Sequence, residues 1–198
     1  SINEAWMSLK RMLDCPIDER ELPAVLDAIK RETALIRGSF YGTMLRNEIF
    51  DFSQLGTYIE RADNTARILD VKYYVLLPSI SWVGSTLDNY QWESILRSVS
   101  AHRSYRWNYE AAYKPTNIAD YLILNVRMPR SLTFCYRFIT EHLKSLGEDY
   151  GERHASHATA EKPQAMLKGG SIKTIFDTGL HEFLTEFIQD NTRLGDEI

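Results

Sequence analysis

The sequence predicts an all-α protein, a helical bundle of about six to seven helices in which long central helices run antiparallel. Two observations predict this fold class. Apolar residues recur at spacings of three and four along most of the chain, and no segment shows the alternating pattern of a strand. Six prolines and ten glycines among 198 residues are few, as expected where helices dominate. A chain of this length buries roughly 70% of its unfolded surface and needs no disulfide or metal to stay folded.

The first half of the chain predicts three helices. A short amphipathic helix is expected over residues 4–13, and a second begins near Pro23, a favoured first-turn residue. The third helix, at about 47–76, has the clearest pattern, and Pro78 ends it before a connection of about ten residues. Its apolar positions form a seam for packing along another helix: Phe52, Leu55, Ile59, Ala62, Ala66, Leu69, Tyr73 and Leu76.

The second half predicts a long fourth helix, at about 88–113, and a shorter one after Pro115. Pro129 opens the next helix, which runs to Gly147. Residues 148–170 are polar and interrupted by glycine and proline, so they are expected to form a surface loop with one helical turn. The last helix spans about 171–191, and the chain is expected to form a single domain over 1–198.

Composition excludes several classes of function. A net charge of −4 gives no general attraction to nucleic acid or an anionic membrane, and no apolar run approaches the ~18 residues of a membrane span. Neither a metal nor a cofactor is expected. His154 and His157 lack further ligands, and Glu141 directly precedes His142, which is the wrong spacing for a di-iron bundle. The two cysteines suit a reducing cytoplasm, with Cys135 a core residue.

A charged cluster lies within the third predicted helix, in YIERADNTARILD at residues 58–70. At about 100° per residue, one flank of the helix carries most of these charges, and Arg61 lies nearly opposite the apolar seam with Asn64 beside it. The residues of this flank are Glu60, Asp63, Arg67 and Asp70. One interpretation is a solvated face with ion pairs three and four residues apart. The other is a set of partly buried charges that must be paired.

The fourth predicted helix supplies partners for such a buried cluster. His102 and Arg106 fall on its inward stripe, where apolar residues are expected. An inward Arg106 needs a carboxylate, and the third helix offers Glu60, Asp63 and Asp70. These side chains would form either a polar clasp that fixes the helix register or the lining of a pocket for a charged ligand.

The run NEIFDFSQLGTYIERADNTARILDVKYYVLLP, with Glu60-Arg61 at its centre, resembles the alpha-E domain family of bacterial helical proteins with a conserved Glu-Arg motif. Upstream ETALIRGSFYGTML and downstream WESILRSVSAHRSYR and LNVRMPRSLTFC extend the resemblance over nearly the whole chain. Family members also have a related segment near their start, so this chain is expected to be a carboxy-terminal portion of a longer one. Thr57 stands where the family has a basic residue.

The resemblance implies a setting rather than an activity. Genes of the family lie beside those for ATP-grasp ligases and transglutaminase-like proteins, which implies the formation and processing of amide or peptide bonds. The leading hypothesis is an accessory binding component of that system, with the ligase and the transglutaminase-like protein as partners. One alternative is an enzyme that uses Glu60 as acid or base, with Arg61, Arg67 or Arg106 binding an anionic substrate. Another is a helical scaffold that forms a homo-oligomer.

Overall fold

The computed structural model describes residues 2–14, 16–74, 85–109 and 113–198. It is helical throughout these ranges, without a strand, so the predicted fold class is confirmed. The predicted end of the third helix at Leu76 and Pro78, and most of the connection after it, lie outside the described residues. Contacts divide the chain into two compact units, Ser1–Phe50 and Asp51–Ile198. The single domain expected over 1–198 stays a prediction.

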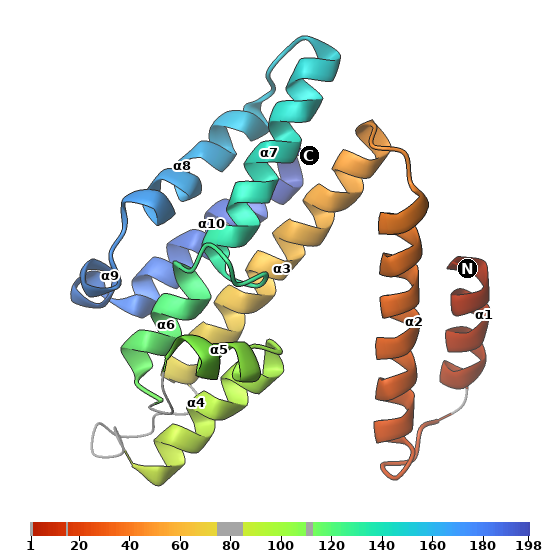
Figure 1. The fold of residues 1–198 in the computed structure, drawn as a ribbon, viewed down its shortest axis with the longest axis horizontal. Helices are drawn as coiled ribbons and strands as arrows, with labels where there is room; N and C mark the ends of the chain where they lie inside the picture. The colour runs from red at the N-terminus through yellow and green to blue at the C-terminus, as the bar shows by residue number, and fades with distance from the viewer. Residues whose placement is uncertain (1, 15, 75–84, 110–112) are drawn as a thin grey trace. The chain divides into compact units, whose positions relative to one another are not determined.

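The first unit contains α1 (Ile2–Leu13) and α2 (Leu22–Thr43), with α3 (Glu48–Tyr74) beginning at its end (Figure 1). Pro23 lies in the first turn of α2, where its missing N–H costs no helical hydrogen bond. The helix continues through Gly38 and Gly42 and ends at Thr43. Among the described residues of this unit, few apolar side chains are buried: Ala5, Val25, Ala28 and Phe50.

The second unit contains the main core, and α3 contributes one side of it. The predicted seam is correct in its centre, where Leu55, Ala62 and Leu69 are fully buried. Its edge differs, because Phe52 is 41% exposed while Tyr58 is buried and stacks on Phe138 at 5.0 Å between ring centroids. The buried stripe of α3 is therefore turned towards α7 (Leu132–Tyr150), which lies beside it (Figure 1).

The long helix predicted over 88–113 is wrong, because the chain turns in its middle. The structure has α4 (Thr86–Ser98) and α5 (His102–Asn108) instead. Ser100 adopts a left-handed backbone with φ of 56°, and the Ala101 amide donates to the Leu96 carbonyl at 2.7 Å. A left-handed residue, followed by an amide that donates to the carbonyl five positions earlier, is the Schellman motif. This motif ends a helix and redirects the chain.

Further helix ends differ from the sequence expectations. The next helices are α6 (Pro115–Ile123) and α7. The Ser131 side chain caps α7, so Pro129 does not open the helix, and α7 continues through Gly147. The last predicted helix is divided into α9 (Ile172–Thr178) and α10 (Leu180–Glu197) by Gly179. Gly179 has a φ of 112°, a backbone conformation that other residues adopt only with strain.

The surface loop expected over 148–170 is largely a helix, α8 (Ala155–Gly169), which packs against α7 and α10. The His154 backbone N–H donates to Nδ1 of His157 at 3.1 Å, and this bond helps to fix the start of the helix. The sequence did not predict this helix, because its buried stripe contains few large apolar residues and includes a proline. The buried residues are Ser156, His157, Ala160, Pro163 and Leu167. These additional helices and breaks give ten helices over the described residues, against six to seven predicted.

Gly147 lets α7 approach the start of α8. A Cβ added there would lie 2.9 Å from Nε2 of His157, which is held 2.7 Å from the Leu143 carbonyl. We expect Gly147→Ala to lower the free energy of unfolding by about 1–2 kcal/mol, because this overlap outweighs the better helix propensity of alanine. Gly56, with open space around its added Cβ, is the matched control.

Urea unfolding of both variants measures the difference. Gly56→Ala should raise the free energy of unfolding by about 0.5–1 kcal/mol, as alanine does inside an exposed helix. If Gly147→Ala were as stabilising as Gly56→Ala, the close packing of His157 against α7 would be wrong.

Candidate functional site

Glu60 and Arg61 lie in the middle of α3 and have different surroundings. The Glu60 side chain is exposed, and its carboxylate makes no hydrogen bond or ion pair with any described residue. Arg61 is half-buried, donates from Nη1 to the Pro129 carbonyl at 3.2 Å and lies 5.1 Å from the ring centroid of Tyr58. Adjacent residues on a helix point about 100° apart, so the two side chains diverge and do not pair with each other.

Asp63, Asn64 and Arg67 form part of the solvated face of α3. Nε of Arg67 donates to Oδ2 of Asp63 at 2.6 Å, with the Arg67 side chain 56% exposed. This bond raises the pKa of the Arg67 guanidinium. Asn64 is exposed. For these residues the interpretation as a surface face with a pair four residues apart is confirmed, and such pairs contribute little stability.

Asp70 is held by a residue that the sequence did not connect with it. Oδ1 of Asp70 lies 2.6 Å from Nδ1 of His181 on α10, and Nε2 of that histidine lies 3.3 Å from the Thr185 hydroxyl. This Asp-His-Thr order resembles an activated hydroxyl. However, Thr185 lies inside α10, where the neighbouring backbone N–H groups are used in helical hydrogen bonds and cannot stabilise an oxyanion. The geometry therefore supports a link between α3 and α10.

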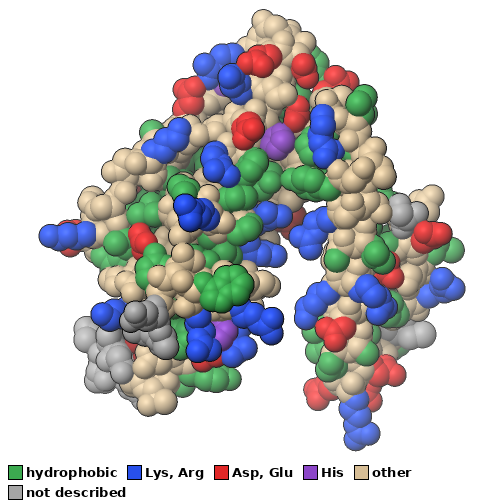
Figure 2. Space-filling model, in the orientation of Figure 1, with side chains coloured by type: hydrophobic (Ala, Val, Ile, Leu, Met, Phe, Trp, Pro, Cys, Tyr) green, Lys and Arg blue, Asp and Glu red, His purple; other side chains and the backbone are tan. Residues whose placement is uncertain are grey.

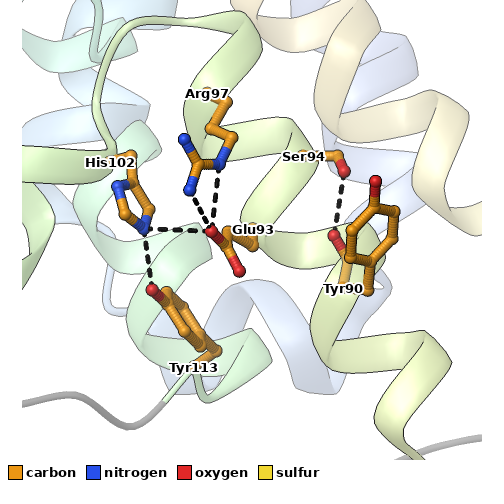
Figure 3. A network of polar contacts seen from close by, with 6 residues as sticks. All are labelled: Tyr90, Glu93, Ser94, Arg97, His102 and Tyr113. Atoms are coloured by element: carbon orange, nitrogen blue, oxygen red, sulfur yellow. Dashed lines mark hydrogen bonds and ion pairs between the residues drawn. The ribbon is translucent and has the colours of Figure 1, made fainter.

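His102 and Arg106 do not form the expected clasp with α3. Nε2 of His102 lies 2.8 Å from the Tyr113 hydroxyl and 3.4 Å from Oε1 of Glu93, which also accepts from Arg97 (Figure 3). The hydrogen bond from Arg97 lowers the pKa of Glu93. Arg106 is exposed rather than inward. The expectation fails because the turn at Ser100 gives α5 a new direction.

The polar clasp between α3 and α4 uses other residues. Nζ of Lys72 lies 2.6 Å from Oδ1 of Asp88 and 2.6 Å from Oε1 of Gln91. The Lys72 side chain is 0% exposed and that of Asp88 4%, and Lys72 also lies 5.4 Å from the ring centroid of Trp92. The sequence carries a signal for this clasp, because Lys72 follows the buried Leu69 by three positions on the same stripe.

A second buried polar junction includes the backbone carbonyl of Ile59, the residue before Glu60. Nδ2 of Asn191 on α10 donates to the Ile59 carbonyl at 3.1 Å, and its Oδ1 accepts from the Tyr136 hydroxyl at 3.1 Å. Asn191 is 1% exposed and Tyr136 is fully buried. One amide side chain therefore joins three helices, α3, α7 and α10, at the level of the Glu-Arg pair.

Two cavities among the described residues of the second unit are lined by other residues. One cavity of about 450 Å³ is lined mainly by α7 and α8, including Leu143 and His157. A second cavity of about 260 Å³ is lined by His157 and Phe52 among others. Neither is lined by a residue of the predicted cluster. Within the described ranges no three His, Cys, Asp or Glu side chains are grouped to hold a metal ion. There too, no helix is long and apolar enough to cross a membrane.

Cys135 is a core residue, as the sequence predicts. It is fully buried at the start of α7, and burial raises the pKa of its thiol to about 12, against a smaller lowering by Arg61. A thiol with that pKa stays protonated at neutral pH and is a poor nucleophile. The geometry therefore gives Cys135 a packing role.

The chain matches the model of a known protein family. A family model described as "a predicted alpha-helical domain with a conserved ER motif", Alpha-E, matches residues 1–198. No curated protein and no solved structure matches the chain. Three Glu-Arg dipeptides occur in the sequence, at 19–20, 60–61 and 152–153, and of these only Glu60-Arg61 lies within a helix. The match over its whole length shows that the chain belongs to the Alpha-E family.

Proposed function

We propose that the protein is a binding component of a bacterial system that forms peptide or amide bonds. In this proposal it contacts an ATP-grasp-type ligase, or the product of that ligase, through the face of α3 that carries Glu60-Arg61. A transglutaminase-like protein is a second partner. The setting rests on the resemblance of the Glu-Arg region to the family. The use of this face rests on the structure around the motif.

The observation that carries the proposal is the asymmetry of the motif. Arg61 is anchored on the Pro129 carbonyl and on Tyr58, whereas the Glu60 carboxylate is exposed and has no partner among the described residues. An ordered helix that presents a free carboxylate beside a positioned guanidinium suits recognition of another molecule. The catalytic alternative, which needs a cleft, draws no support from the two cavities described above, because Glu60 lines neither of them.

Retention of the purified ATP-grasp-type ligase on a column carrying the full-length protein tests the proposal. Glu60→Gln should release the ligase earlier, while Glu182→Gln, an exposed glutamate on α10, should leave retention unchanged. Equal retention by both variants would remove the motif from the binding surface. If Glu60→Gln keeps the ligase but abolishes turnover of a ligase product, the catalytic alternative replaces the proposal.

A further inference from the structure

Aromatic and basic side chains gather where α3 and α7 lie side by side. Tyr58 from α3 stacks on Phe138 at 5.0 Å, and Phe134 lies 4.8 Å from Phe138 between ring centroids. Arg61 and Arg137 lie over these rings. We call these five residues the arginine–aromatic face. Figure 2 shows basic side chains beside hydrophobic ones on the side of residues 51–198 that it presents.

The two guanidinium groups are held by rings instead of carboxylates. Arg61 lies 5.1 Å from the Tyr58 centroid, and Arg137 lies 4.7 Å from that of Phe138 and 5.1 Å from that of Phe134. The Arg61 guanidinium uses one donor for the Pro129 carbonyl, and the Arg137 guanidinium donates to no described residue. Neither forms an ion pair within the described part of the chain. Other arginines of this unit do pair with carboxylates: Arg67, Arg97, Arg153 and Arg193.

This arrangement leaves N–H donors of the Arg61 and Arg137 guanidinium groups available to a ligand. A guanidinium stacked on a ring keeps its charge and loses little freedom when it binds, and its fork of N–H groups matches a carboxylate. Phe134 and Phe138 are half-buried, so they offer apolar contact beside the charges. Arginine and aromatic residues together are typical of the residues that dominate protein–protein binding.

The charges nearby favour a carboxylate over a polyanion. Glu60 is adjacent to Arg61 in α3, and the exposed Glu141 follows Arg137 by one helical turn. These carboxylates and the net charge of −4 oppose a long run of phosphates, as in nucleic acid. A short peptide segment with few charges avoids most of this repulsion.

We propose that the arginine–aromatic face binds an acidic peptide segment of a partner protein. Its carboxylates accept hydrogen bonds from Arg61 and Arg137, and an apolar side chain of the segment covers Phe134 and Phe138. This inference deepens the proposed function, because it gives the chemistry of the partner segment. It rests on the proposed function, which makes the partner a protein.

The test uses fluorescence anisotropy of a labelled six-residue peptide of alternating glutamate and leucine, added to the full-length protein. Arg137→Gln is the main variant, because Arg137 is exposed and its loss leaves no buried group unpaired. Arg193→Gln, an exposed arginine on α10, is the control, because Asp190, which Arg193 contacts at 3.6 Å, keeps its ion pair with Lys162. We expect Arg137→Gln to weaken binding of the peptide about tenfold, because it removes one charge-assisted pair. Arg193→Gln should leave the binding unchanged.

Three results would overturn the inference: no binding of the peptide, equal binding of a peptide with glutamine in place of glutamate, or equal binding by Arg137→Gln and the unaltered protein. Tighter binding of inorganic phosphate or a DNA oligonucleotide than of the peptide would also overturn it. The ligase column distinguishes this failure from that of the proposed function. If the column retains the ligase and the peptide does not compete with it, the proposed function stands and the inference fails. If the protein binds the peptide but does not retain the ligase, the inference stands and the proposed function fails.

Discussion

Lys72→Met should lower the free energy of unfolding by about 3–5 kcal/mol. The substitution leaves Asp88 with its charge in a site where only 4% of its side chain is exposed, and Gln91 loses a bond of 2.6 Å. A buried carboxylate without its cation is among the most costly single defects in a protein core. The effect should extend to both α3 and α4, because Lys72 joins them.

Urea unfolding monitored by circular dichroism gives this change, with Arg67→Met as the matched control. Arg67 lies in the same helix and has an ion pair of the same 2.6 Å length, but its side chain is 56% exposed. Its loss should therefore cost no more than about 0.5 kcal/mol. The double variant Lys72→Met with Asp88→Leu should recover most of the loss, since apolar groups can replace a buried pair. Equal effects of Lys72→Met and Arg67→Met would show that the clasp is not buried.

Asn191→Leu is expected to have the next largest effect, a loss of about 2–3 kcal/mol. The leucine cannot accept from the buried Tyr136 hydroxyl or donate to the Ile59 carbonyl, so the hydroxyl remains in the core without its partner. Tyr136→Phe removes the same hydroxyl, and its cost should overlap with that of Asn191→Leu instead of adding to it.

Thermal and urea unfolding of the two single variants and the double variant measure this coupling. Asn64→Leu, on the exposed side of α3, controls for the change of residue type and should alter stability by less than about 0.5 kcal/mol. Strictly additive effects of the two core substitutions would contradict the hydrogen bond between Asn191 and Tyr136.

The fold was predictable from the sequence where large apolar residues recur without interruption. The stripe of α3 centred on Leu55, Ala62 and Leu69 is an example. The prediction failed where backbone geometry decided the outcome. Ser100 gives no signal in its residue type for a left-handed conformation, because glycine is the usual residue there. The helix α8 was missed because its stripe contains Ser156 and Pro163, which are typical of loops.

The candidate site was predictable only along one helix. Spacing correctly paired Asp63 with Arg67, because residues four apart on a helix are neighbours. Partners on other helices could not be derived, since they depend on how distant segments pack. Asp70 pairs with His181, 111 residues further on, and Arg61 with the Pro129 carbonyl, 68 residues further on. Arg106 was assigned inward on the assumption of one continuous helix, and the break before α5 removed that basis.

The free energy of unfolding of Glu60→Gln tests the central claim, that the motif is a presented surface and not a buried clasp. The exposed carboxylate has no partner among the described residues, so the change should stay within about 0.5 kcal/mol of zero. Arg61→Met, which loses the bond to Pro129 and the contact with Tyr58, should cost about 1–2 kcal/mol in the same measurement. A loss above about 2 kcal/mol for Glu60→Gln would contradict the claim and make Glu60 part of a buried ion pair.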